Sequence, residues 1–432
     1  MFLGIAAIYF LLFCVFAWKN FRLAALLFIV MLPSYLIRGE IGPFPTTLLE
    51  LSFGALFLVW LIKYAKGDGE EIKKVMREHK FLFGAIGLFM IASVVSIFVS
   101  DMVVASLGQW RAYFLEPMVL FLILVGRRKE IALRHLIVAL GISTLSVSVL
   151  AIIQQFTGWE IATAEWANPA TRRVTSFFSS PNAVGLYLGP IIPLLLITVI
   201  PAKAGIQTVL TSGRTAWLPA FAGMTALAII SILFTRSEGA WVALGVGVVL
   251  FAYLIGYKKM AVATVIAGIV IALVVPQIRT ALLFQDKAGQ NRLRLWSYSW
   301  NYLTESPKNF FLGAGIRQFF RKVQKPRYNP KEMERLIYPH SIFLNFWTEI
   351  GLFGALSFSA IMGYLVYLAN KIRTREPVLG AALLASLAVI IVHGLVDVPY
   401  FKNDLATMFW IIATLVIASI NHPHSGYHNF TF

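Results

Sequence analysis

A single histidine, His340, closes the only long polar stretch of an otherwise apolar chain. This stretch runs from about residue 276 to residue 354 and holds twelve of the 37 Lys and Arg residues. Histidine can accept a proton near neutral pH, and the guanidinium of arginine matches the oxygens of a phosphate. A histidine among guanidinium groups beside an apolar run therefore points to chemistry on a phosphate-bearing lipid.

The spacing of apolar residues in this stretch predicts how the candidate groups are held. Leu293, Trp296, Trp300 and Leu303 recur every three or four residues, which predicts one apolar face of a helix lying at a membrane interface. Arg292 lies four residues before Trp296 and shares that face.

Breaks follow this helix. The sequences SPKN at 306–309 and GAG at 313–315 predict an interruption and then a second short helix around Arg317 and Arg321. A further short helix is expected at 329–336, and Pro339 restricts the backbone before His340.

Composition defines the class of protein. Apolar residues make up 59% of the chain, charged residues 13%, and the mean hydropathy is +0.77, which indicates a polytopic membrane protein. The formal charge of +17 lies mostly in short loops, where it encodes topology, so nucleic-acid binding is not expected. Cys14 is the only cysteine, which excludes an intrachain disulfide and a thiolate metal site.

The sequence predicts an all-α polytopic membrane protein with about 12–14 transmembrane helices and one long external loop. Runs long enough to cross the hydrocarbon core are expected at 2–17, 21–37, 45–63, 81–99, 103–125, 131–155, 182–200, 217–235, 238–256, 260–276, 341–369, 378–395 and 403–420. They divide the chain into N-terminal helices (1–170), central helices (171–276), an external loop (277–340) and C-terminal helices (341–432).

Basic residues set the expected orientation. They concentrate in the loops near 19–22, 63–80, 127–134, 203–214, 258–259 and 371–375, which alternation places on one side, predicted to be cytoplasmic. The 277–340 loop then lies outside although it is basic. Either it has a ligand, or it is a solvated cap lying on anionic headgroups. Asp68, Gly69 and Glu70 lie in a charge-rich cytoplasmic loop and are interpreted as solvated.

Ionisable residues inside or beside the spans are further candidates. Arg111 and Glu116 either line a polar cavity or pair with each other. Arg236 and Glu238 are expected at the outer turn between two spans. Asp397 is expected at the outer end of its span, facing the same compartment as His340, whereas His393 is expected to make an ordinary interhelical hydrogen bond.

Residues 200–225 resemble the translated form of an interspersed palindromic repeat, with PAKAGIQ and PAFAGMT at its ends. We expect a late insertion in a cytoplasmic loop that lends its last residues to the next span.

Four stretches together resemble the O-antigen ligase and O-antigen polymerase family of bacterial envelope proteins. They are SFFSSPNAVGLYLG (176–189), LFTRSEGAW (233–241), NRLRLWSYSWNYLTESPKNFFLGAGIRQF (291–319) and HSIFLNFWTEIGLFG (340–354). The resemblance implies a GT-C-like glycosyltransferase in the bacterial inner membrane. It implies transfer of a glycan from undecaprenyl pyrophosphate on the periplasmic face, with no metal or other cofactor.

By position, His340 matches the family's loop histidine and Arg292 its loop arginine. Ser341 stands where the family usually has asparagine. Glu238 stands where it often has arginine, with Arg236 as the nearest cation. The residues expected to contact substrate are Arg236, Glu238, Arg317, Arg321, Asn182, Arg111 and Asp397.

The expected reaction is displacement at a sugar C1, with His340 as base and arginines binding the departing pyrophosphate. The acceptor is a lipid A core, another glycan or a protein. Alternatives are a polysaccharide polymerase, a non-catalytic assembly scaffold and a lipid-linked glycan transporter. A transporter is disfavoured because the two halves show no matching broken helices.

Overall fold

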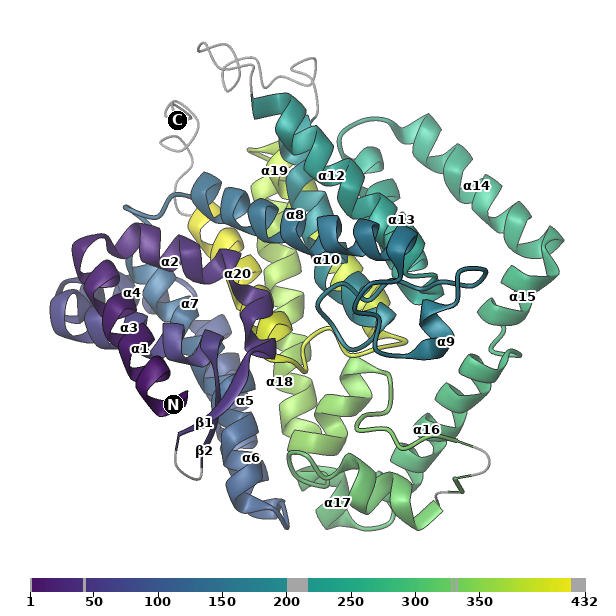
Figure 1. The fold of residues 1–432 in the computed structure, drawn as a ribbon, viewed down its shortest axis with the longest axis horizontal. Coiled ribbons are helices and arrows are strands. Elements are labelled where there is room, and N and C mark those ends of the chain that lie inside the picture. The colour runs from purple at the N-terminus through teal and green to yellow at the C-terminus, as the bar shows by residue number, and fades with distance from the viewer. Residues whose placement is uncertain (1, 42–43, 200–216, 328, 331–332, 421–432) are drawn as a thin grey trace.

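The computed structural model describes residues 2–41, 44–199, 217–327, 329–330 and 333–420. Within these ranges the regular elements are helices apart from one short hairpin, so the all-α fold class is confirmed (Figure 1). The N-terminal elements are α1 (Phe2–Lys19), α2 (Phe21–Val30), η1 (Leu32–Leu36), β1 (Arg38–Ile41), β2 (Phe44–Thr47), α3 (Leu48–Lys63), α4 (Ala65–Glu78), α5 (Lys80–Val99), α6 (Val103–Trp110), η2 (Arg111–Leu115), α7 (Glu116–Gly126), α8 (Leu133–Thr157) and α9 (Ala164–Ala167).

The remaining elements carry the candidate site. They are α10 (Pro181–Val199), α12 (Trp217–Phe234), α13 (Glu238–Leu254), α14 (Lys258–Val274), α15 (Pro276–Leu282), α16 (Lys287–Thr304), α17 (Pro307–Leu312), η4 (Phe319–Gln324), η5 (Lys325–Arg327), α18 (Ile342–Arg373), α19 (Pro377–Gly394) and α20 (Asn403–Ile420).

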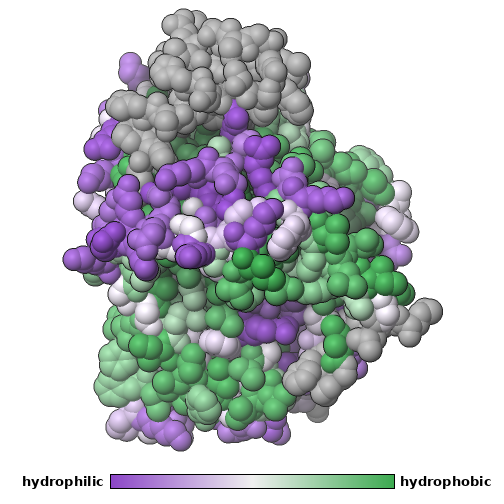
Figure 2. Space-filling view, turned by 90° about the vertical axis from the view of Figure 1, so that its left-hand side faces the viewer, coloured by the Kyte–Doolittle hydropathy of each residue, from purple (hydrophilic) through white to green (hydrophobic). Residues whose placement is uncertain are grey.

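Among the described residues, seven helices are long and apolar enough to cross a membrane, or up to nine if each of two bent pairs is one span. The bent pairs are α3 with α4 and α14 with α15–α16. The predicted 12–14 spans also include four further apolar helices, of which residues Gly4–Lys19, Phe21–Val30, Pro219–Phe234 and Glu238–Leu254 are described. Figure 2 shows a hydrophobic zone between two hydrophilic bands, as a multi-pass membrane protein requires.

Two C-terminal helices, α18 and α20, pack against N-terminal helices and so connect the two ends of the chain. α18 packs against α5, α19 and α20, and α20 packs against α7 and α8. α20 is almost wholly enclosed, whereas α14 is exposed along most of its length and packs mainly on α13 and α15. In Figure 1, α14, α15 and α16 run down one edge of the molecule.

Small residues allow α10, α13 and α19 to pack closely. A Cβ added at Gly185 would lie 2.4 Å from Ala240 Cβ, and one added at Gly247 would lie 2.4 Å from Val389 Cγ2. Such close approach is how helices associate in lipid. It brings the start of α10 beside the turn between α12 and α13. Arg236 lies in this turn between two helices, as predicted.

The 277–340 segment partly follows the prediction. α16 contains the expected helix and starts at the N-cap Asp286. Leu293 and Trp300 are exposed on its surface, as an interfacial face requires, but Leu303 is buried. The opposite side, with Leu295 and Tyr302, packs against the rest of the loop.

The expected interruption is present, since α16 ends at Thr304; a short helix that was not expected there, α17, then begins with Ser306 as its cap and Pro307 in its first turn. The helix expected at 329–336 is wrong for the described residues 333–336. There the side chain of Gln324 accepts a hydrogen bond from Leu336 N (2.9 Å) and donates one to Glu334 O (2.9 Å), which replaces helical backbone bonds.

The loop joins the membrane helices at a junction of glycines. α18 is kinked at Gly351, whose φ is +77°, and a Cβ there would lie 2.1 Å from Phe311 O. Gly313 and Gly315 also have positive φ and meet backbone atoms of α18 and of the end of α5. Only glycine fits so close an approach in this conformation.

Residues 200–216 of the repeat-like segment lie outside the described residues. α12 begins at Trp217, so residues 217–225 are helical, as expected.

Candidate active site

The crossing of α18 and α19 places His340 beside Asp397. A Cβ on Gly394, the last residue of α19, would lie 2.6 Å from Ile342 Cγ2 at the start of α18, so the crossing depends on glycine. His340 precedes α18 with φ of +54°, and Asp397 lies in the 395–402 loop after α19. Two residues 57 positions apart thus meet at the same end of the bundle.

His340 and Asp397 form a buried pair. His340 Nδ1 lies 3.3 Å from Asp397 Oδ1, and the two side chains are 19% and 4% exposed. Asp397 Oδ1 also accepts a hydrogen bond from Val398 N at 2.9 Å. Burial by itself would raise the pKa of Asp397, but the charge and hydrogen bond of His340, with help from His393 and Val398 N–H, lower it well below its usual range. The carboxylate is therefore ionised and can hold the ring in one orientation.

The other ring nitrogen of His340 remains available. Nε2 has no hydrogen-bond partner among the described residues, and Nδ1 is the atom that contacts Asp397. The ring of Tyr338 packs edge-on against the imidazole, with centroids 5.2 Å apart. Burial, followed by the charge of Asp397, raises the pKa of Tyr338, so this phenol stays neutral. The arrangement leaves Nε2 of His340 open to a proton from a substrate hydroxyl.

Two further predicted residues reach the same segment. Arg292, half-buried on α16, donates from Nε to Val396 O at 3.1 Å. Its two terminal nitrogens have no partner among the residues that the structure describes. Asn182, in the first turn of α10, donates from Nδ2 to Asp397 Oδ2 at 3.3 Å. His340, Asp397, Arg292 and Asn182 therefore converge on residues 396–397.

Sequence reasoning missed Arg173 as a site residue. Its Nε donates to Thr235 O at 2.9 Å, and its NH2 group lies 3.4 Å from Asn182 Oδ1. Burial lowers the pKa of Arg173, while Glu238 and Glu165 act in the opposite direction. Its two partners, Thr235 and Asn182, lie 62 and nine residues away in the sequence, and no local pattern indicates either contact.

Arg236 and Glu238 lie at the turn before α13, and both are exposed. Arg236 has φ of +50°, and Glu238 is the first residue of α13. Both interact electrostatically with Arg173. Arg173 therefore joins this turn to the Asn182–Asp397 contact.

Arg317 and Arg321 are exposed on the 277–340 segment. The hydrogen bonds and ion pairs of His340 and Asp397 within the described chain involve neither of them. Arg317 has φ of +66°, and its backbone N–H faces the carboxylate of Glu349. Their contact with substrate stays a prediction.

Arg111 lies away from this group of contacts. Its guanidinium forms ion pairs with Glu50 (2.7 Å) and Glu116 (3.1 Å) from a π-helical turn. This geometry supports the interpretation of Arg111 and Glu116 as a structural pair. The interhelical hydrogen bond expected for His393 is not found within the described chain, since its Nδ1 is buried without a partner.

No group of three or more His, Cys, Asp or Glu side chains in the described parts of the chain lies close enough to hold a metal ion. The metal requirement is thus a question for assay.

These features define a multi-pass membrane protein with a histidine–aspartate pair and a guanidinium at one end of its helices. Residues 222–359 match the family model described as O-Antigen ligase. The match runs from α12 into α18 and includes Arg236, Glu238, Arg292 and His340, so the resemblance is confirmed over this part of the chain. Asn182 and Asp397 lie outside the match. No curated protein matches the chain.

Proposed function

We propose that the protein is an O-antigen ligase-like glycosyltransferase that moves a glycan from undecaprenyl pyrophosphate to an acceptor hydroxyl on the periplasmic face of the bacterial inner membrane. The observation that carries the proposal is the convergence of His340, Asp397 and Arg292 on residues 396–397. A base and a cation are the two groups that this displacement needs.

In the proposed reaction the acceptor oxygen attacks C1 of the sugar. The bond between C1 and the pyrophosphate oxygen breaks, and the acceptor proton passes to His340 Nε2. Asp397 stabilises the resulting imidazolium through Nδ1–H. The leaving group is undecaprenyl pyrophosphate.

Arg292 is proposed to bind the departing pyrophosphate. Its Nε is fixed by Val396 O, so its terminal nitrogens are oriented and free for phosphate oxygens. Such charge-assisted hydrogen bonds are strongest where charge develops in the transition state. Arg173 adds a second guanidinium on the far side of Asn182.

The test is transfer from a purified lipid-linked oligosaccharide to a purified acceptor, with the protein in liposomes and EDTA present. His340→Ala should lower the rate on the order of 10²-fold or more, within the range of a general base. The matched control is His135→Ala, which changes a histidine in the first turn of α8 and should transfer at the wild-type rate. If correctly inserted His340→Ala protein also transfers at that rate, the loop has no catalytic role and the scaffold becomes the better account.

The acceptor is identified by the surface-glycan profile of a deletion strain. A ligase predicts that the whole ladder is lost from lipid A. A polymerase predicts a ladder that collapses to one repeat unit.

A further inference from the structure

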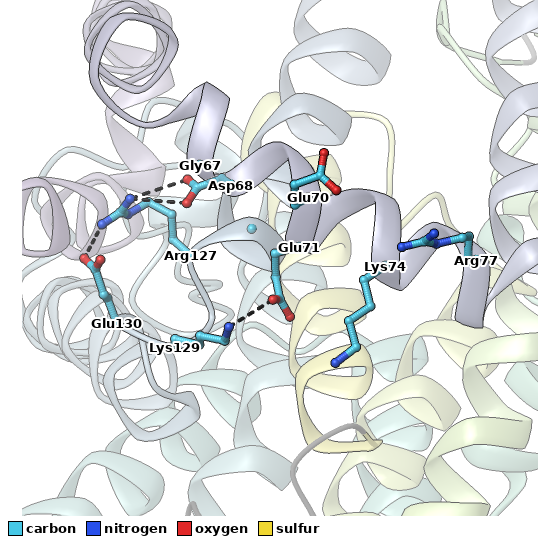
Figure 3. A pocket seen from close by; sticks show the side chains of 10 residues that line it. Gly67, Asp68, Glu70, Glu71, Lys74, Arg77, Arg127, Lys129 and Glu130 are labelled. Carbon is cyan, nitrogen blue, oxygen red and sulfur yellow. Dashed lines mark hydrogen bonds and ion pairs between the residues drawn. The ribbon is translucent and has the colours of Figure 1, made fainter.

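A second cluster of charged side chains, which the proposed reaction does not use, lines a cavity of about 430 Å³ between α4 and the turn after α7 (Figure 3). α4 is bent 96° from α3 and covers the end of α7. A Cβ on Gly126 would lie 2.9 Å from Asp68 Cβ, so the two elements touch at a glycine. Arg127, 4% exposed, lies 3.7 Å from the ring centroid of Tyr64 and pairs with Asp68 at 3.4 Å. The wall of the cavity is therefore built from fixed contacts.

The carboxylates of this cavity all have cationic partners. Besides Asp68, Glu130 also pairs with Arg127. Glu71 pairs with both Arg128 and Lys129, and Glu70 pairs with Lys73 at 2.8 Å.

Two lining cations form no ion pair of their own. Lys74 and Arg77 lie one helical turn apart and make no ion pair or hydrogen bond with any described residue, although the charge of Arg77 helps to lower the pKa of Glu70; Figure 3 shows them to one side of the paired groups. The four lining carboxylates are matched by four cations, Lys73, Arg127, Arg128 and Lys129, so Lys74 and Arg77 leave an excess of two positive charges at the cavity.

Exposed apolar residues place the cavity at the edge of the hydrocarbon layer. Leu61 and Ile62 precede α4 and are 52% and 63% exposed, and Phe81 follows it and is 61% exposed. Side chains of this kind face lipid tails in a membrane protein, so α4 lies between them at the level of the headgroups. The sequence assigns this level to the cytoplasmic leaflet.

We propose that this cavity binds the phosphate of an anionic phospholipid headgroup through Lys74 and Arg77. Basic side chains at this depth attract anionic lipids, and paired cations one turn apart can hold one phosphate together. A zwitterionic headgroup fits less well because its ammonium finds no free carboxylate. This site is separate from the His340 site and does not depend on the transfer reaction.

The test measures lipid bound to the full-length protein by native mass spectrometry, after release from nanodiscs of phosphatidylcholine with added phosphatidylglycerol. Lys74→Gln/Arg77→Gln should lower phosphatidylglycerol affinity on the order of 30-fold, from the loss of two charges at the surface. Lys66→Gln/Lys80→Gln removes the same charge from α4 and the first residue of α5, outside the cavity lining, and should change affinity far less. Lys74→Arg/Arg77→Lys should keep binding.

Three results would overturn the proposal. One is an equal loss in both glutamine pairs, since α4 would then attract lipid without a defined site. Another is equal binding of phosphatidylcholine and phosphatidylglycerol. The third is displacement of the lipid by millimolar glycerol phosphate or inorganic phosphate, because the ligand would then be a soluble phosphate.

Discussion

Replacing Asp397 by asparagine tests whether this residue acts through His340. The substitution keeps the size of the side chain and its contact with Asn182 but removes the charge that faces His340 Nδ1. If Asp397 only orients and stabilises the imidazole, its effect must vanish once the imidazole is gone.

The expected size follows from the contact. Hydrogen bonds to charged groups contribute about 1.5–3 kcal/mol, and the separation of 3.3 Å is longer than the best charge-assisted bonds, which favours the lower end. About 1.5 kcal/mol corresponds to a roughly tenfold lower transfer rate. Asp397→Ala should cost more, because it also leaves Asn182 Nδ2 without its acceptor.

The assay is a double-mutant cycle on the transfer rate in liposomes. His340→Ala and the double variant His340→Ala/Asp397→Asn should be equally slow, since the two residues act as a unit. A further tenfold loss in the double variant would refute the reasoning, because Asp397 would then act on substrate independently of His340.

Three other predictions test the glycine junction at Gly351, the guanidinium of Arg292 and the charge of Asp397. Gly351→Ala should sharply reduce the yield of monodisperse protein in size-exclusion chromatography, because a Cβ would lie 2.1 Å from Phe311 O at φ of +77°. Gly363→Ala, on the same helix with nothing within 4 Å, is the control and should be neutral or stabilising; equal yields for both would contradict the account of the kink. Arg292→Lys keeps the charge but loses the planar fork, so donor affinity measured with labelled lipid pyrophosphate should fall on the order of tenfold; unchanged affinity would remove Arg292 from the pyrophosphate site. The lowered pKa of Asp397 means that its contribution to stability is complete above its ordinary pKa of 3.8 and is lost as pH falls through the lower folded-state pKa. The difference in melting temperature between wild type and Asp397→Asn should therefore be larger at about pH 5 than below about pH 4; a difference that grows as pH falls from about 5 would contradict that sign.

The helical fold was predictable because the requirement that lipid imposes applies to each apolar segment by itself. An apolar run long enough to cross the bilayer must form a helix to satisfy its backbone, and each predicted run contains or overlaps a helix in the structure. α16 was predictable for a similar reason, since its apolar spacing is a local property of residues 293–303.

Predictions of local structure failed where a side chain outside the segment forms hydrogen bonds with its backbone. The interruption at residues 306–309 was predicted, but the short helix α17 that Ser306 caps was not. Residues 333–336 have a composition typical of helices, yet the side chain of Gln324 forms hydrogen bonds with the backbone of Glu334 and Leu336, ten or more residues away in the chain.

The candidate site was predictable by residue type but not by contact. Asp397 and His340 were expected on the same side of the membrane, yet their pairing depends on Gly394 at a helix crossing. Arg111 was a candidate for substrate, and its partner Glu50 lies 61 residues away in sequence. Arg173 carried no local signal, because its two contacts are with an amide and a carbonyl on other elements.

The exposure of α14 has a consequence for any reconstitution. This helix of 17 residues is about 25 Å long, somewhat shorter than a typical hydrocarbon core of about 30 Å. Because it packs mainly on α13 and α15 and is otherwise exposed, the bilayer contributes to its tilt and depth. α14 leads through a 99° bend into α16, the helix that carries Arg292. The thickness of the host bilayer thus acts on the position of this guanidinium, and acyl-chain length becomes a variable to control when transfer rates are compared.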